Sequence, residues 1–139
     1  MINKTDDLRI INTQELISPK DVISQISPSK SGLNTIIKTR SEIKDILDKK
    51  SNKFVIVVGP CSIHDVDAAK EYAAKLKNLK NESSENILLI MRAYFEKPRT
   101  VIGWKGLIND PDLDGSFKIN KGIKIARQLL MDLSEMNIP

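Results

Sequence analysis

Three basic side chains stand close together in the second half of the chain, directly after an apolar run. Arg92, Lys97 and Arg99 fall within eight positions, and Pro98 and Thr100 flank Arg99. Arginine binds phosphate or carboxylate through two parallel hydrogen bonds, and lysine acts as a point charge. A solvated basic loop is the simpler explanation, but an unpaired charge at the end of a buried strand would be costly. We therefore predict a site for one or two phosphorylated or carboxylated metabolites.

A second reactive group follows an earlier apolar run. Cys61 has three possible roles: a soft metal ligand, a nucleophile or a small buried hydrophobe. Its residue type alone favours the last role, because free cysteines are among the most buried residues. Its place at the end of a strand adds support for the role of metal ligand, and no base is fixed by spacing for a nucleophile. His64, the only histidine, is more readily a hydrogen-bonding loop residue, since Cys-x-x-His alone closes no metal site.

Both reactive groups lie where a predicted strand ends. Residues 54–58 and 87–91 are continuous apolar runs, which are typical of parallel strands buried on both faces. A helical segment separates them, so we expect a right-handed parallel strand–helix–strand unit. Ligands bind at the carboxyl ends of parallel strands in α/β folds. Cys61 and Arg92 should therefore lie on the same side of one sheet.

The remaining elements follow from helical spacing, capping residues and turn residues. Trp104 is expected to pack the long loop at 96–118, and residues 110–115 to form a turn, because they lack the distal glutamate of a calcium loop. The other expected elements are a short strand at 6–11, a helix from Ser18 that ends before 27–29, a linker at 29–32, a helix at 34–50, a helix capped by Asp65 at 66–81, a polar turn at 82–85, and a helix capped by Asn120 that ends near 136.

Composition narrows the class of protein. Apolar residues make up 40% of the chain and charged residues 29%, as in an ordinary globular domain. The net charge of +4 is weak support for nucleic-acid binding, because 17 scattered lysines outnumber 5 arginines and aromatic residues are only 4%. One cysteine excludes an internal disulfide and fits a reducing compartment. No apolar run approaches the ~20 residues that span a bilayer. We expect a cytoplasmic α/β protein that binds neither nucleic acid nor membrane.

The length raises a separate expectation. The chain has 139 residues, which is well short of the ~250 residues of a closed eight-stranded barrel. Two parallel strands with three helices would leave an apolar sheet edge open. We therefore expect this sequence to be the N-terminal part of a larger protein, or to be completed by another chain.

Three stretches resemble the type I, feedback-regulated 3-deoxy-D-arabino-heptulosonate 7-phosphate synthases. They are Gly59–Asp65, Arg92–Thr100 and Gly103–Pro111, and the similarity extends from Asp6 to the last helix. The resemblance implies a (β/α)8 barrel, of which residues 1–33 would be an N-terminal extension and residues 34–139 the first two βα units. It also implies condensation of phosphoenolpyruvate with erythrose 4-phosphate, the first step of the shikimate pathway.

The same resemblance implies roles for individual residues. Cys61 would be one ligand of a divalent metal ion of the Mn, Fe, Co or Zn type, with the family's remaining ligands absent from this chain. Arg92 and Lys97 would be catalytic and bind phosphoenolpyruvate. Pro98, Arg99 and Thr100 would contact erythrose 4-phosphate. Asp6 and Asp7 would belong to a segment that meets a neighbouring subunit of a homo-oligomer and shapes a pocket for an aromatic amino acid inhibitor.

A second interpretation comes from a different class of protein. The chain would be a truncated, non-catalytic remnant, or an accessory chain that associates with a full-length synthase. The motifs are intact, which favours the synthase, because a long-decayed remnant should have lost some of them. If 139 residues is the natural length, we expect little or no catalysis, because a lone thiolate does not hold an exchangeable metal.

Overall fold

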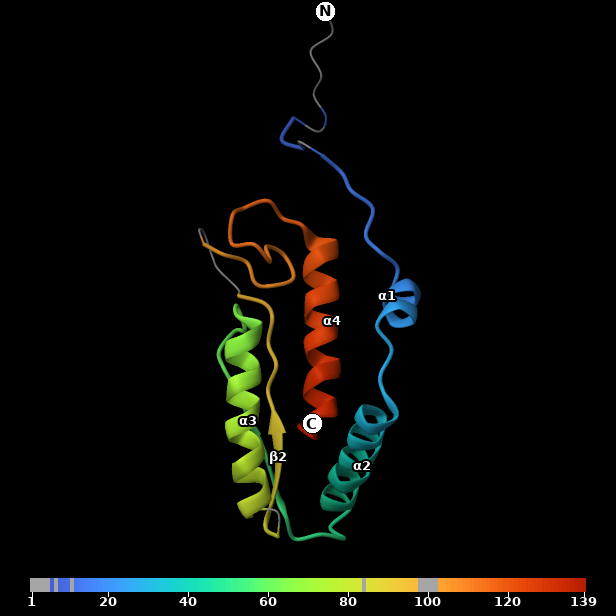
Figure 1. Ribbon diagram of the computed structural model, residues 1–139, viewed down its shortest axis with the longest axis vertical. Coiled ribbons are helices and arrows are strands. Elements are labelled where there is room, and N and C mark those ends of the chain that lie inside the picture. Colours follow the sequence, from blue (N-terminus) through green and yellow to red (C-terminus); the bar gives the residue numbers. More distant parts are fainter. Residues whose placement is uncertain (1–5, 7, 11, 84, 98–102) are drawn as a thin grey trace, which may run out of the picture.

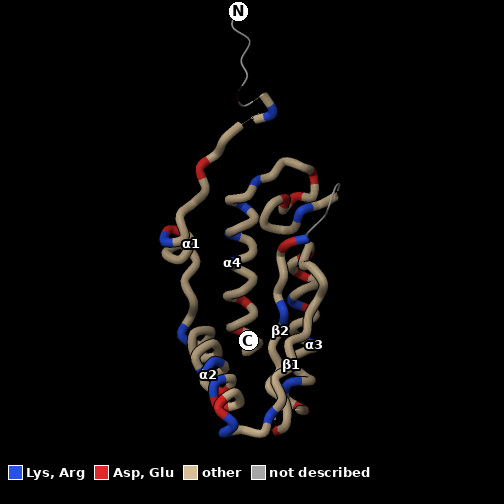
Figure 2. Tube along the Cα trace, turned by 180° about the vertical axis from the view of Figure 1, so that it is seen from behind, with Lys and Arg blue, Asp and Glu red and all other residues tan. Residues whose placement is uncertain are grey.

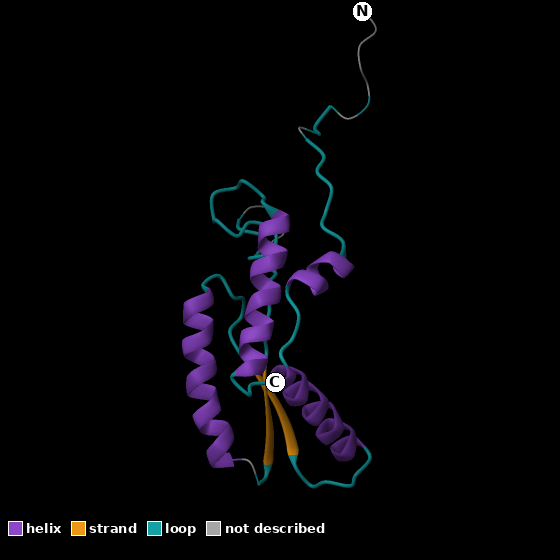
Figure 3. Ribbon diagram, turned by 45° about the vertical axis from the view of Figure 1, so that its right-hand side comes forward, coloured by secondary structure: helices purple, strands orange, loops and turns teal. Residues whose placement is uncertain are grey.

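The computed structural model describes residues 6, 8–10, 12–83, 85–97 and 103–139, which form a mixed α/β arrangement (Figure 1). Two parallel strands pair with each other, and helices lie on either side of them (Figure 3). The elements in chain order are α1 (Pro19–Gln25), α2 (Lys30–Leu47), β1 (Phe54–Val58), α3 (Val66–Ser83), β2 (Ile87–Met91) and α4 (Ile119–Glu135).

The two strands have the bounds that the apolar runs predict. They pair in parallel, from Phe54 opposite Ile87 to Val58 opposite Met91. Helix α3 connects them, which confirms the parallel strand–helix–strand unit. At the end of β2, the backbone N–H of Met91 donates to the carbonyl of Pro139 at 2.8 Å. The last residue of the sequence therefore lies beside β2.

Side-chain caps explain where the helices begin. Ser18 accepts from the N–H of Asp21, and Asp65 accepts from the first turn of α3, as predicted. The predicted linker at 29–32 is wrong. Ser29 accepts a hydrogen bond from the N–H of Gly32 at 3.1 Å and caps α2, so the helix begins at Lys30. Residues 30–32 therefore belong to the first turn of α2 and do not form a linker.

Three other local predictions are also wrong. Asn120 does not cap α4, because its side chain bonds instead to the backbone of Ile17 and Glu15, at 2.9 and 3.0 Å. These bonds tie the N-terminal segment to the start of α4, whose cap position is Lys118. Helix α3 continues through Ser83, past the start of the turn predicted at 82–85. The described residues of the segment 6–11 form no strand.

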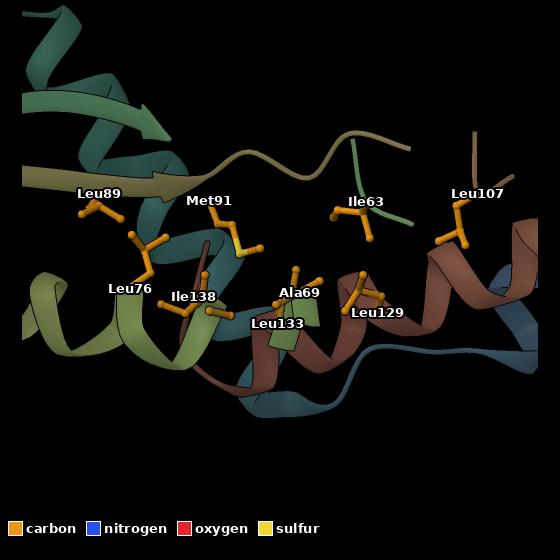
Figure 4. Close-up of a cluster of buried hydrophobic side chains, with 10 residues drawn as sticks. Ile63, Ala69, Leu76, Leu89, Met91, Leu107, Leu129, Leu133 and Ile138 are labelled. Carbon is orange, nitrogen blue, oxygen red and sulfur yellow. The ribbon is translucent and has the colours of Figure 1, made fainter. Parts of the chain in front are cut away.

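The hydrophobic core lies between β2, α3 and α4, and it extends to the loops above the strands (Figure 4). Leu129 is fully inaccessible to solvent. Each large side chain buried in this way contributes about 1.5–3 kcal/mol to folding. Because Ile63 and Leu107 belong to the core, the loops that carry the reactive residues are anchored to it. Its members are Ile63, Ala69, Ala73, Leu76, Leu89, Met91, Leu107, Leu129, Leu133 and Ile138.

Strand β1 departs from the sequence prediction. All five of its side chains are exposed, and Phe54 is 74% accessible. The prediction of burial on both faces is therefore wrong for β1, whereas Leu88, Leu89 and Met91 of β2 are buried. The reason is that the core formed with α3 and α4 contains side chains of β2 and none of β1. Along its outer edge β1 pairs with no other strand in the described part of the chain.

Charged residues are dispersed along the helices and loops (Figure 2). Each of the four helices carries both basic and acidic residues, as expected for a solvated surface. Within the ranges that the structure describes, no helix combines the length and apolarity needed to cross a bilayer.

Candidate functional site

The loops that follow β1 and β2 are joined by backbone hydrogen bonds. The N–H of Arg92 donates to Val58 at 2.9 Å, and the N–H of Ile63 donates to Tyr94 at 2.8 Å. Gly59 is required for this close approach, because a methyl group at that position would overlap the carbonyl oxygen of Arg92. The prediction that the two loops meet on one side of the sheet is confirmed.

The guanidinium of Arg92 is held in place by the neighbouring loop. Its Nη1 donates to the carbonyl oxygens of Pro60, at 2.5 Å, and Cys61, at 2.9 Å. Its Cζ lies 4.4 Å from the centre of the Tyr94 ring, within the range of a cation–π contact. The Nε and Nη2 donors bond to no residue in the described ranges. Within these ranges, the Nε–Nη2 edge of the guanidinium is therefore available to an anion.

Lys97 brings a second cation to the same place. Its Nζ lies 3.4 Å from the Sγ of Cys61. The thiol is exposed, so the role of a small buried hydrophobe, which residue type alone favoured, is wrong for Cys61. The backbone N–H of Lys97 donates to the carbonyl of Lys105 at 2.9 Å. The chain thus folds back on itself next to the two cations.

The long loop between β2 and α4 is packed by its own residues. The indole N–H of Trp104 donates to the carbonyl of Asp110 at 2.8 Å, as the packing role predicted for this tryptophan requires. The carboxylate of Asp110 accepts from the N–H of Gly115, which closes the predicted turn at 110–115. Leu107 anchors the loop to the core and donates its N–H to Phe95 at 2.8 Å.

A charge cluster fixes the end of this loop at the start of α4. Lys118 donates to Asp112 at 2.8 Å, and Lys121 donates to the other carboxylate oxygen. These hydrogen bonds from Lys118 and Lys121 hold the pKa of Asp112 below its ordinary value. The two ion pairs of Asp112 thus join the loop to the start of α4.

Some of the predicted site residues lie outside the described residues: Pro98, Arg99, Thr100 and Asp7. Asp6 is described and exposed. The N-terminal segment to which Asp6 belongs extends away from the strands (Figure 1). The structure therefore brings together Cys61, Arg92 and Lys97 among the predicted residues. It also adds Tyr94, which sequence reasoning missed because an aromatic residue near an arginine has no distinctive spacing.

The described residues do not fit a metal ion by themselves. They contain no group of three or more His, Cys, Asp or Glu side chains that could hold one. A protein metal site of the kind that Cys61 would suit needs at least three protein ligands. His64 faces Trp104 edge-on, with ring centres 6.5 Å apart, which agrees with a loop-packing role for this histidine.

Comparisons with known proteins agree on one family. Residues 25–137 match the model described as "DAHP synthetase I family". The Phe-sensitive phospho-2-dehydro-3-deoxyheptonate aldolase of Escherichia coli (strain K12) is 46% identical over 136 residues, which cover 98% of this chain and 39% of that protein. The Trp-sensitive enzyme of Buchnera aphidicola subsp. Baizongia pistaciae is 44% identical over 138 residues, covering 99% and 40%.

A solved structure agrees as well. The phospho-2-dehydro-3-deoxyheptonate aldolase of Francisella tularensis SCHU S4 superposes with a TM-score of 0.89 at 51% identity, over 94% of this chain and 38% of that one. The chain thus spans about 40% of the length of the curated relatives that it matches.

Proposed function

This chain belongs to the DAHP synthetase I family, and we propose that it supplies part of the active site of a 3-deoxy-7-phosphoheptulonate synthase. In the proposed reaction, phosphoenolpyruvate condenses with erythrose 4-phosphate and water adds as phosphate leaves, which gives 3-deoxy-D-arabino-heptulosonate 7-phosphate and inorganic phosphate, the first step of aromatic amino acid biosynthesis. One observation carries the proposal. Two cations from the loop after β2, Arg92 and Lys97, contact the backbone and thiol of Cys61 in the loop after β1.

Each cation has a distinct task in this proposal. Arg92, held by the carbonyls of Pro60 and Cys61, offers Nε and Nη2 to the phosphate or carboxylate of phosphoenolpyruvate as a bidentate donor. Lys97 offsets negative charge on the same anion and on the aldehyde oxygen where charge develops. Because both groups are already placed, they need little reorganisation when the substrate binds. We propose that Pro98, Arg99 and Thr100 contact erythrose 4-phosphate.

The fold proposal follows from the same relatives. We infer that β1, α3, β2 and α4 are the first two βα units of a (β/α)8 barrel, and that residues 1–33 form an N-terminal extension. The superposition on the Francisella enzyme supports this inference. Cys61 is proposed as one ligand of a divalent metal. No step is assigned to that metal, because the described residues offer no complete ligand set.

Regulation and assembly also remain proposals. Relatives are named Phe-sensitive and Trp-sensitive, and we propose that an aromatic amino acid inhibits this protein too. The segment with Asp6 and Asp7 is proposed to contact a neighbouring subunit in a cytoplasmic homo-oligomer.

The deciding experiment is an assay of the protein purified from its native source, with its intact mass measured on the same sample. Phosphate release should require both phosphoenolpyruvate and erythrose 4-phosphate. Omitting the aldehyde is the control for simple hydrolysis of phosphoenolpyruvate. Absence of phosphate release with both substrates and added divalent metal would contradict the proposal. If that sample also has a mass of 15.6 kDa, the accessory-chain alternative would be preferred.

A further inference from the structure

We propose that Tyr94 is a positioning residue that holds the Arg92 guanidinium in the plane needed to bind the anionic substrate. The ring of Tyr94 lies under the guanidinium, with 4.4 Å between Cζ and the ring centre. The role rests on the proposed function, because it concerns the phosphoenolpyruvate site. Tyr94 acts through Arg92 and needs no contact with the substrate.

The ring owes its place to the backbone on either side of it. The carbonyl of Tyr94 accepts from Ile63 at 2.8 Å, and the N–H of Arg92 donates to Val58 at 2.9 Å. Ile63 is in turn 2% exposed and part of the core. The backbone that carries the ring is therefore fixed to the loop after β1 and, through Ile63, to the core.

Two kinds of contact restrain the guanidinium in different ways. The ring occupies one face and fixes the plane, because an aromatic face attracts a cation laid against it. The carbonyls of Pro60 and Cys61 occupy Nη1 and fix the rotation within that plane. In the part of the chain that the structure describes, the edge made by Nε and Nη2 is left for a bidentate contact with a carboxylate or phosphate. Without the ring, the arginine side chain would keep its Nη1 bonds but lose the fixed direction of that edge.

The proposal assigns the effect to the aromatic ring rather than to the phenol hydroxyl. Tyr94→Phe should therefore keep the dissociation constant for phosphoenolpyruvate within about two-fold, whereas Tyr94→Leu should raise it about three- to ten-fold, as expected for loss of a partly exposed cation–π contact. Tyr72, the other tyrosine, packs against the core from α3. Tyr72→Leu is the matched control, and it should leave the dissociation constant unchanged even if stability falls.

A double-mutant cycle tests whether Tyr94 acts through Arg92. Calorimetric titration measures how much Tyr94→Leu changes the dissociation constant for phosphoenolpyruvate, first in the natural sequence and then in the Arg92→Ala variant. The effect of the leucine should disappear when the arginine is absent. An equal effect in both backgrounds would overturn the proposal, because the tyrosine would then act independently of Arg92.

A spectroscopic measurement separates this inference from the proposed function. The ring current of Tyr94 should shift the Nε–H resonance of Arg92 in the substrate-free protein, with assignment by Arg92→Lys. Tyr94→Phe should keep that shift and Tyr94→Leu should abolish it. A resonance unmoved by Tyr94→Leu would refute the positioning role. If the shift is present but phosphoenolpyruvate does not bind, the proposed function fails and the ring contact stands.

Discussion

The ammonium of Lys97 lies 3.4 Å from the thiol of Cys61, although 36 positions separate the two residues in the sequence. The contact exists because two parallel strands end at the same edge of the sheet and their loops cross there. The ammonium and the thiol are thus brought together by the topology of the fold and not by a local sequence motif.

Removing either cation of the site should damage catalysis much more than stability. Arg92→Ala and Lys97→Ala are each expected to lower kcat/KM more than ~100-fold, because fixed charges at a reacting anion stabilise the transition state. Steady-state assays with both substrates measure the effect. Lys75→Ala is the control, because Lys75 is exposed on α3 and pairs with Glu71. A loss of only a few-fold at Arg92 would reject its catalytic role.

Gly59→Ala should separate the two loops of the site. The added methyl group would overlap the carbonyl of Arg92, and relieving such an overlap costs about 2 kcal/mol or more. Urea unfolding measures the loss, and binding of phosphoenolpyruvate should weaken in the same variant. Gly115→Ala is the contrast, since open space surrounds that position and only the φ of 74°, which alanine rarely adopts, opposes the substitution. It should lower stability by about 1 kcal/mol and leave binding intact; equal binding losses would argue against a special role for Gly59.

The ion pair between Lys70 and Asp132 should make stability depend on pH at both extremes. Their side chains meet at 2.6 Å and join α3 to α4. Burial raises the pKa of Asp132, but hydrogen bonds from Lys70 and Gln128 outweigh it and leave the pKa below 3.8. The hydrogen bond with Asp132 raises the pKa of Lys70 above 10.5, against a smaller effect of burial.

The sign of this dependence follows from linkage. The contribution of Asp132 to stability is complete above the pKa that this residue has in the unfolded chain. It is lost as the pH falls through the lower pKa that it has in the folded protein. The contribution of Lys70 is lost as the pH rises above 10.5. Asp132→Asn should therefore destabilise the protein at pH 7, by no more than about 1 kcal/mol for a partly exposed pair. Urea titrations should show this difference shrinking toward pH 3; a difference that grows instead would contradict the assignment.

Leu129 should be among the most sensitive positions of the core. Its side chain is fully buried where α4 meets the loop residues. Leu129→Ala is expected to lower the free energy of unfolding by about 2–5 kcal/mol, because it leaves a cavity. Leu79→Ala, on the exposed end of α3 with 54% of that leucine accessible, should cost less than about 1 kcal/mol. Similar losses at both positions, measured by thermal or urea unfolding, would disprove the described core.

Local sequence patterns identify most of the helices and strands but do not show which of them are buried. The apolar runs at 54–58 and 87–91 locate both strands, and Asp65 locates the start of α3, because these signals are local. The same runs fail to distinguish the exposed β1 from the buried β2, since burial depends on which helices cover each strand. A pattern of adjacent residues contains no such information.

The sequence likewise predicts some features of the site and not others. The positions of Cys61, Arg92 and Lys97 at strand ends are visible in the sequence, and their convergence follows from parallel pairing. The partners of Asn120 are not visible, because an asparagine near a helix start is ordinarily a cap, whereas this one reaches Glu15 and Ile17. The support of Arg92 by Tyr94 is hidden for the same reason: it depends on the rotamer of one side chain over another.

The parallel pairing of β1 with β2 also constrains how the molecule can fold. Helix α3 has a local cap and local contacts, so it can form on the microsecond scale of helices. The strands are distant in sequence, and their pairing must first overcome the entropy of closing the intervening chain. The loops that carry Cys61 and Arg92 can meet only after that closure. Substitutions in these loops should therefore speed unfolding more than they slow folding.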